Sequence, residues 1–119
     1  MHDEHDLFDD YLARLARTLR EGEHMLACLL LAEFALELDR RIRYEERALA
    51  FTYGNVEPRN PLATVRREHT SMRLLVSSIA CALDRADDRR ALDVVGTLRS
   101  VLLLHAVKEE PLLAPMDIH

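Results

Sequence analysis

Histidine and glutamate residues that could bind a metal recur in the two halves of the chain with the same spacing. The stretch His105–Glu110 contains a histidine and, beginning four residues later, a glutamate pair. The stretch Arg41–Glu46 lies 64 positions earlier and has a glutamate pair at the same place. The same shift carries the pair Glu68–His69 onto the pair Glu4–His5. A spacing that repeats at several positions indicates a duplicated architecture.

The repeat has one break that bears on chemistry, because Arg41 stands where the second half has His105. Residues four apart stack on one face of a helix, so His105 and Glu109 can point at a common centre. His69, from a neighbouring helix, can complete a set of two imidazoles and one carboxylate. This set suits non-haem Fe(II) and leaves open positions for an exogenous ligand.

Helices must position these side chains, and the composition favours helices. The chain has 119 residues, of which 49% are hydrophobic and 31% charged, with only three glycines and four prolines. This balance is typical of helical proteins. Apolar residues recur at intervals of three and four, as in a core-facing helix. The pattern predicts four helices: about Asp6–Arg20, about Glu23–Phe51, about Pro61–Asp84, and a fourth that is capped by Asp87 or Asp88 and runs to about Glu110.

Glycine, asparagine and proline positions predict how the helices begin and end. Gly22 ends the first helix and permits a tight reversal of the chain. Asn60 is expected to cap the third helix, with Pro61 at its first position. Pro111 and Pro115 are expected to stop the fourth helix, because proline lacks the N–H that continues a helix.

The predicted architecture is a single all-α domain over residues 1–119. Helical hairpins are expected at about residues 4–52 and 61–113, joined by a crossing at residues 53–60. They form an antiparallel up-down-up-down four-helix bundle built from two pseudo-repeated hairpins. Ionisable groups inside a bundle are costly unless they are paired or bound to a metal. Six such groups fall on the apolar stripes and should meet in one layer near one end of the bundle: His5, Arg41, Glu45, His69, His105 and Glu109.

Charge, hydropathy and cysteine content argue against several classes of function. The formal net charge of −5 gives no support for nucleic acid as a partner. No apolar run is long enough for a membrane span, and the acidic residues 1–6 do not resemble a signal peptide. Cys28 and Cys81 form no metal-binding or disulfide motif, and we expect both to be small buried residues of helices. A cytoplasmic protein with reduced thiols is the simplest interpretation.

Over essentially its whole length, the chain resembles the hemerythrin-like, or HHE cation-binding, domain family. The stretches Glu68–Arg73 and Glu109–Pro115 are similar to those of the family. The resemblance implies two irons held by a histidine of helix one, His-x-x-x-Glu of helix two, a histidine of helix three and His-x-x-x-Glu of helix four. The residues of this chain that match are His5, Glu45, His69, His105 and Glu109, and the two glutamates would bridge the metals.

The chain departs from this family pattern at Arg41, where the histidine of helix two should stand. A guanidinium stays protonated, offers no lone pair to a metal, and repels a cation. By the resemblance, the first-half site keeps His5 and Glu45 but lacks its third ligand, whereas the second-half site is complete. Glu46 and Glu110 would face outward or support the ligands, with Glu110 as a reserve ligand.

Three interpretations of function remain open. In the first, a hemerythrin-like protein binds one or two non-haem iron ions and senses, stores or carries iron, dioxygen, nitric oxide or peroxide. In the second, the bundle is metal-free and serves as a structural or interaction module. There Arg41 takes the place of a cation and forms bidentate hydrogen bonds to Glu45 or Glu109, with Glu37 as a further candidate. Apart from metal binding, Glu45 and Glu109 could be ion-pair partners of Arg41 and Arg73. In the third, the iron serves an oxidoreductase, for example one that repairs damaged iron centres.

The long helices also predict a protein partner. Leu29–Leu31 and Leu102–Leu104 place leucines beyond the core-facing stripe. A helix that is apolar around much of its girth is covered by more than its own bundle. A homodimer is therefore expected.

Overall fold

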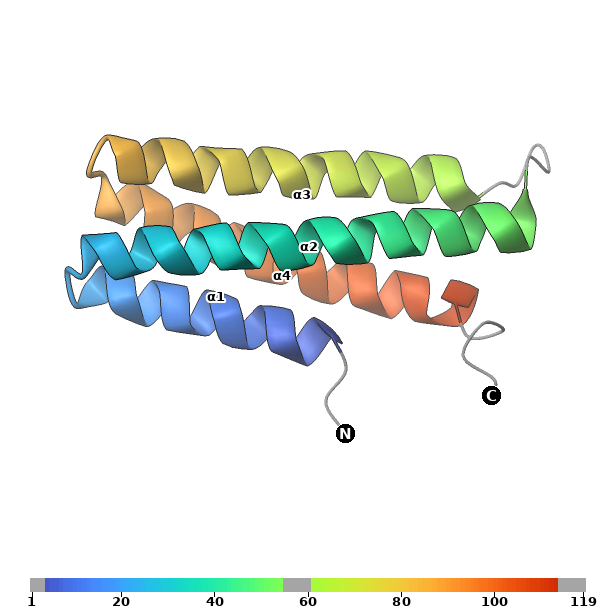
Figure 1. Cartoon of the computed structure of the whole chain (residues 1–119), viewed down its shortest axis with the longest axis horizontal. Coiled ribbons are helices and arrows are strands. Elements are labelled where there is room, and N and C mark those ends of the chain that lie inside the picture. Colours follow the sequence, from blue (N-terminus) through green and yellow to red (C-terminus); the bar gives the residue numbers. More distant parts are fainter. Residues whose placement is uncertain (1–3, 55–60, 114–119) are drawn as a thin grey trace.

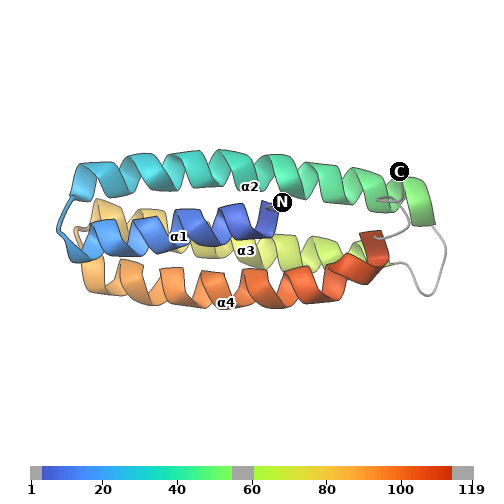
Figure 2. The same cartoon turned by 90° about the horizontal axis from the view of Figure 1, so that it is seen from below.

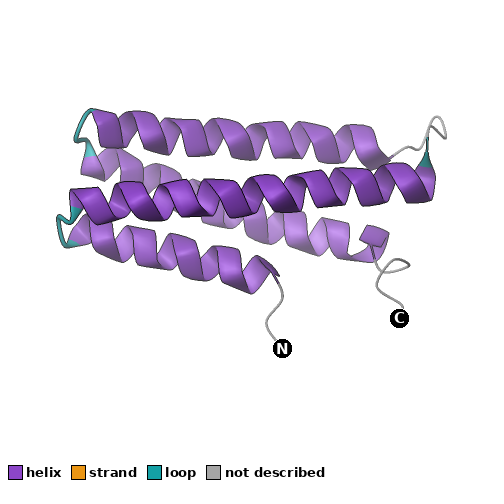
Figure 3. Ribbon diagram, viewed as in Figure 1, coloured by secondary structure: helices purple, strands orange, loops and turns teal. Residues whose placement is uncertain are grey.

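The computed structural model describes residues 4–54 and 61–113, apart from the side chains of residues 4–6, 110, 112 and 113. The described chain forms four helices: α1 (Glu4–Arg20), α2 (His24–Tyr53), α3 (Pro61–Asp84) and α4 (Asp88–Leu113). Each helix packs against the next in chain order, and α1 also packs against α4 (Figure 1). Figure 3 shows that short turns join the helices at one end of the bundle. The predicted all-α four-helix bundle is confirmed. None of the described helices combines the length and hydropathy that a membrane span requires.

The two short turns, between α1 and α2 and between α3 and α4, share the backbone hydrogen bonds that end the preceding helix. In the first turn, Gly22 has a φ of 72°, and the N–H of Glu23 donates to the carbonyl oxygen five residues earlier (3.0 Å). In the second turn, Ala86 has a φ of 55°, and the N–H of Asp87 makes the equivalent bond (2.8 Å). This is the Schellman arrangement, in which a residue in the left-handed region ends a helix. The predicted turn at Gly22 is confirmed, and the 64-residue spacing extends to both turns.

The helices that follow these turns begin differently. Oδ1 of Asp87 accepts a hydrogen bond from the backbone N–H of Arg90 (3.1 Å), so Asp87 caps α4. Asp87 was one of the two residues predicted as the cap. Glu23, 64 residues earlier, stands at the same position before α2 and makes no side-chain capping bond. The predicted cap of α3, Asn60, lies outside the described residues.

Two helices run further than the sequence predicts. The helix α2 continues two residues beyond Phe51, to Tyr53, and Gly54 follows with a φ of 59°. The helix α4 continues through Pro111 to Leu113, so the prediction that Pro111 stops it was wrong. A proline inside a helix removes one hydrogen bond and kinks the helix, and near a terminus this costs least. Figure 2 shows the last turn of α4 bending away from the axis of the helix.

The hydrophobic core has two parts. The larger cluster fills the space between all four helices and includes Phe34, Met72 and Leu98. The smaller cluster lies nearer the end of α2 and the start of α3 and contains Ala48, Leu49, Leu62 and Val65. Figure 2 shows why they differ: α1, with 17 residues against 30 in α2, begins partway along the other helices. Beyond the start of α1, the described bundle consists of α2, α3 and α4.

Both cysteines are exposed, so the prediction that they are buried was wrong. Cys28 follows the buried Ala27, and Cys81 precedes the buried Ala82. One step along a helix turns a side chain by about 100°, which is enough to move it from the core to the surface. The buried stripes are therefore narrower than the apolar composition suggests.

Candidate metal centre

Four of the predicted ligands meet in one layer of the bundle. Glu45 comes from α2, His69 from α3, and His105 and Glu109 from α4. Their ligand atoms all lie within 4.8 Å of one another. Every one of these side chains is buried, with at most 4% of its surface exposed. The predicted gathering of these four groups is confirmed, whereas the fifth predicted ligand, His5, has a side chain outside the described part of the structure.

The layer lies between the two apolar clusters. On α2, Glu45 stands between Ile42 of the larger cluster and Ala48 of the smaller one. On α3, His69 stands between Met72 and Val65 in the same way. Both clusters exclude water from the carboxylates and imidazoles, and this strengthens every electrostatic interaction among them.

Both imidazoles direct the same nitrogen into the layer. Nε2 of His69 lies 2.8 Å from Oε1 of Glu45, and Nε2 of His105 lies 3.1 Å from the same oxygen. The ring centroids of the two histidines are 5.1 Å apart. Two Nε2 atoms that converge on one carboxylate oxygen give the arrangement that a metal ion needs from its nitrogen ligands.

The opposite nitrogen of each imidazole is held by a carboxylate outside the layer. Nδ1 of His69 lies 2.8 Å from Oε2 of Glu46, and Nδ1 of His105 lies 2.7 Å from Oε1 of Glu68. An ionised carboxylate only accepts hydrogen bonds, so Nδ1–H is the donor in each pair. In a metal-bound ring this Nδ1–H tautomer would leave the Nε2 lone pair to the metal, whereas without a metal the short contacts with Glu45 are hydrogen bonds in which Nε2–H donates. Carboxylates play this part beside most metal-binding histidines.

The resemblance implied that Glu46 faces outward or supports the ligands, whereas the role of Glu68 was not predicted. Glu68 precedes His69 by one residue, which turns its side chain about 100° away from that histidine and towards α4. There its second oxygen also lies 3.4 Å from Nζ of Lys108. The sequence pair Glu68–His69 was the available signal, because a carboxylate next to a buried histidine can accept a hydrogen bond from a histidine of the neighbouring helix.

The buried Glu109 carboxylate, which is 1% exposed, has no hydrogen-bond donor at Oε1. Its Oε2 contacts Nε2 of His105, and its Oε1 lies 4.0 Å from a terminal nitrogen of Arg41. A buried carboxylate oxygen without a donor is costly. Coordination of a cation would remove this cost, so the residues present fit a metal.

Burial and neighbouring charges shift the pKa values of the layer in opposite directions. Burial alone would raise the pKa of Glu45, but hydrogen bonds from His105 and His69 hold it well below its usual range. Burial, reinforced by the Glu45 carboxylate, raises the pKa of Glu109 to about 7. Burial lowers the pKa of His105, but Glu109 and Glu45 outweigh it and raise the pKa to about 10. At neutral pH the layer thus holds a proton on His105 that a metal would have to displace.

Arg41 is the cation beside this layer. Its Nε lies 2.6 Å from Oε2 of Glu45, and its guanidinium lies 5.2 Å from the centroid of the Tyr44 ring. The predicted contact between Arg41 and the site carboxylates is therefore confirmed for Glu45. Arg73 was wrongly predicted to pair with them, because its terminal nitrogen bonds to Asp39 (3.2 Å) on the surface of the bundle.

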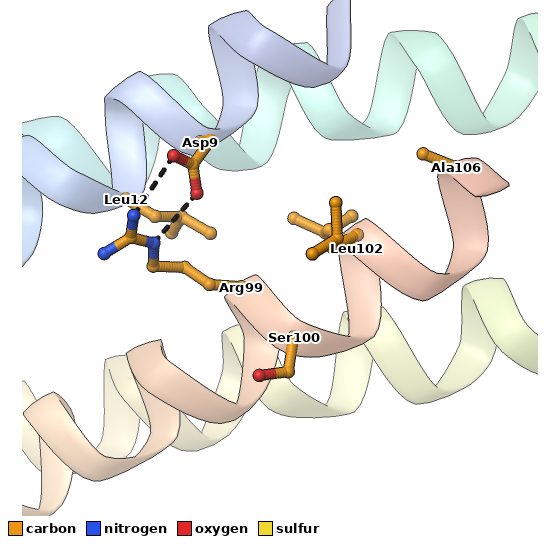
Figure 4. A pocket seen from close by; sticks show the side chains of 7 residues that line it. Asp9, Leu12, Arg99, Ser100, Leu102 and Ala106 are labelled. Carbon is orange, nitrogen blue, oxygen red and sulfur yellow. Dashed lines mark hydrogen bonds and ion pairs between the residues drawn. The ribbon is translucent and has the colours of Figure 1, made fainter.

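A small cavity reaches the layer, and a larger one lies elsewhere. The small cavity, of about 200 Å³, lies between α3 and α4, and Val65, Lys108 and Glu109 are among the residues that line it. The larger cavity, of about 390 Å³, lies between α1 and α4 (Figure 4). There Arg99 donates two hydrogen bonds to Asp9, at 2.9 and 3.1 Å, and so ties α4 to α1.

Comparisons with family models, with curated proteins and with solved structures found no match to this chain.

Proposed function

We propose that this protein binds one non-haem iron ion through Glu45, His69, His105 and Glu109. The observation that carries the proposal is the convergence of four buried ligand atoms within 4.8 Å of one another. Two imidazoles with one or two carboxylates form a donor set that suits Fe(II). The resemblance to hemerythrin-like domains, which rests on the same residues, supports iron as the metal.

A bound iron would supply a place for a small exogenous ligand such as dioxygen, nitric oxide or peroxide. The cavity of about 200 Å³ beside Glu109 has room for molecules of this size but not for a large substrate. We propose that the protein senses, stores or carries iron or such a ligand. A reducing compartment such as the cytoplasm would suit both Fe(II) and the two free, exposed cysteines.

A metal-free structural module is the second candidate, and the contact between Arg41 and Glu45 favours it. A guanidinium at 2.6 Å from a buried carboxylate already neutralises part of the charge that a metal would neutralise. If the protein is such a module, treatment with a chelator should leave its structure and its stability unchanged.

We also propose a homodimer, because large apolar side chains lie on the surface of α2 and α4. Each of the two leucine runs has members with most of their surface exposed, at Leu29, Leu103 and Leu104. Met25 and Leu36 extend the apolar surface along α2. Sedimentation at several concentrations tests this proposal, and a monomer at every concentration would reject it.

Anaerobic titration of the chelator-treated protein with Fe(II) tests the metal proposal. We expect one ion per chain, and loss of binding in His69→Ala and in Glu109→Ala. The matched control is His24→Ala, which removes an exposed imidazole outside the layer. Helix content by circular dichroism confirms that each variant folds. The proposal is wrong if the natural sequence binds no metal, or if all three variants bind alike.

A further inference from the structure

Arg41 lies on the opposite side of the Glu45 carboxylate from the two imidazoles. Oε1 of Glu45 faces Nε2 of both histidines, at 2.8 and 3.1 Å, whereas Oε2 faces Nε of Arg41 at 2.6 Å. The same guanidinium places a terminal nitrogen 4.0 Å from Oε1 of Glu109. One guanidinium thus contacts both carboxylates of the layer, one from α2 and one from α4.

This contact sets Arg41 in competition with any cation for the same two carboxylates. The charge of a guanidinium persists at every accessible pH, and its nitrogens offer no lone pair to a metal. Arg41 therefore neutralises the carboxylates without contributing a ligand. Because Glu45 and Glu109 are at most 2% exposed, the surrounding solvent screens this charge only weakly.

The Arg41 side chain can also move away from Glu45 towards the solvent. Its side chain is 18% exposed, in contrast to the buried ligands, and it lies over the half-exposed ring of Tyr44. A cation arriving among the imidazoles can weaken the pairing of Arg41 with Glu45 without opening the core.

We infer that Arg41 is a built-in counter-ion that takes the place of a second metal ion and weakens the affinity of the layer for the one ion that it binds. This inference rests on the proposed metal-binding function. It assigns to Arg41 two opposite effects. Arg41 stabilises the protein without metal, because it neutralises two buried carboxylates, and it destabilises the metal complex, because it competes for them.

The test is Arg41→Met, which removes the charge and keeps much of the side-chain volume. Co(II) serves as the probe, titrated into chelator-treated protein and followed by calorimetry and visible absorption. We expect Co(II) to bind at least about tenfold more tightly than to the natural sequence, because a like charge a few ångströms away is lost. The stoichiometry should stay at one. The unfolding temperature of the metal-free variant should fall by roughly 5 °C or more.

Three further variants make the test decisive. Arg41→Lys keeps the charge, so its Co(II) affinity should stay within about threefold of the natural sequence. Arg73→Met removes a guanidinium that pairs with Asp39 outside the layer, and its affinity should not change. Arg41→Gln is the neutral substitute if Arg41→Met does not fold.

The outcomes separate this inference from the proposed function. Tighter binding together with lower metal-free stability supports it. If the neutral variants bind and the natural sequence binds none, the proposed function fails for the natural sequence, while the competition by Arg41 stands. If the natural sequence binds Co(II) and the neutral variants bind no more tightly, the inference is overturned while the metal function stands. An unchanged unfolding temperature in the metal-free variant also overturns it. If neither the natural sequence nor the neutral variants bind, both proposals fail.

Discussion

In the first hairpin the turn is made by Gly22 and the metal-facing position of the long helix is Arg41. In the second hairpin the turn is made by Ala86 and the equivalent position is His105. The backbone of the two turns is the same, down to the Schellman hydrogen bonds, although one turn has glycine and the other alanine. The layer is different, because His105 directs an imidazole nitrogen that can lose its proton into it, whereas Arg41 directs a permanent charge. Backbone geometry thus survives a substitution that adds a methyl group, whereas the chemistry of the layer changes with one side chain.

The largest effect is expected from a variant that makes the second hairpin like the first. In His105→Arg, the layer loses an imidazole ligand and gains a second fixed charge, so we expect metal affinity to fall by at least about 100-fold. A calorimetric titration with Co(II) measures the change. The reciprocal change, Arg41→His, should raise the metal stoichiometry above one if the lost imidazole is the defect of the first half. Unchanged stoichiometry in that variant would show that the first half lacks more than a ligand.

Much of this comparison could be predicted from the sequence. Periodic apolar residues report burial, so the helices and the buried positions of Glu45, His69, His105 and Glu109 followed from spacing. A buried carboxylate or imidazole needs a partner, and for that reason the pattern also indicated the role of Arg41.

The missed features depend on rotation and on local geometry, which spacing does not report. Glu68 reaches His105 only because α3 is turned so that its side chain faces α4. Cys28 and Cys81 lie one step off the buried stripe, and one step decides exposure. Pro111 was expected to end α4, but a kink in the last turn costs less than unfolding that turn.

A smaller effect is expected from the two carboxylates that hold the outer nitrogens of the imidazoles, Glu46 and Glu68. Glu68→Gln keeps the shape of the side chain but removes the charge that orients the His105 imidazole, and Glu46→Gln does the same for His69. We expect each change to weaken Co(II) binding by about 10- to 100-fold. Glu33→Gln is the control, because Glu33 is an exposed glutamate of α2. Equal affinity in all three variants would mean that the imidazoles need no such support.

The pH dependence should separate the two hairpins further, because His105 titrates and Arg41 does not. The pKa of His105 is raised to about 10 in the fold, above the ordinary value of 6.5. Its stabilising contribution to the metal-free protein is therefore complete below about pH 6.5 and is lost as pH rises through about 10. The unfolding temperature of the metal-free protein should fall by roughly 5 °C between pH 7 and pH 10.

Metal affinity should change in the opposite direction over the same range. A metal binds the neutral imidazole, so each pH unit should strengthen binding by up to about tenfold while one proton is displaced. Buffers of different ionisation enthalpy in a calorimetric titration count the released protons. An affinity that is flat between pH 6 and pH 8 would contradict protonation of His105.

The smallest expected effect concerns the turns, where the two hairpins agree in backbone and differ in residue. Ala86 adopts a φ of 55°, in the left-handed region that costs a residue with a Cβ about 1 kcal/mol. Ala86→Gly should therefore raise the free energy of unfolding, by at most about 1 kcal/mol, since glycine also gains entropy in the unfolded chain. Gly22→Ala should lower it by a similar amount, although a Cβ at Gly22 would meet no atom within 4 Å. Urea unfolding measures the free energy of unfolding of both variants. Opposite signs would show that the left-handed backbone alone decides the difference, because neither substitution touches the metal layer. Equal signs would mean that the two turns differ in more than the residue that makes them.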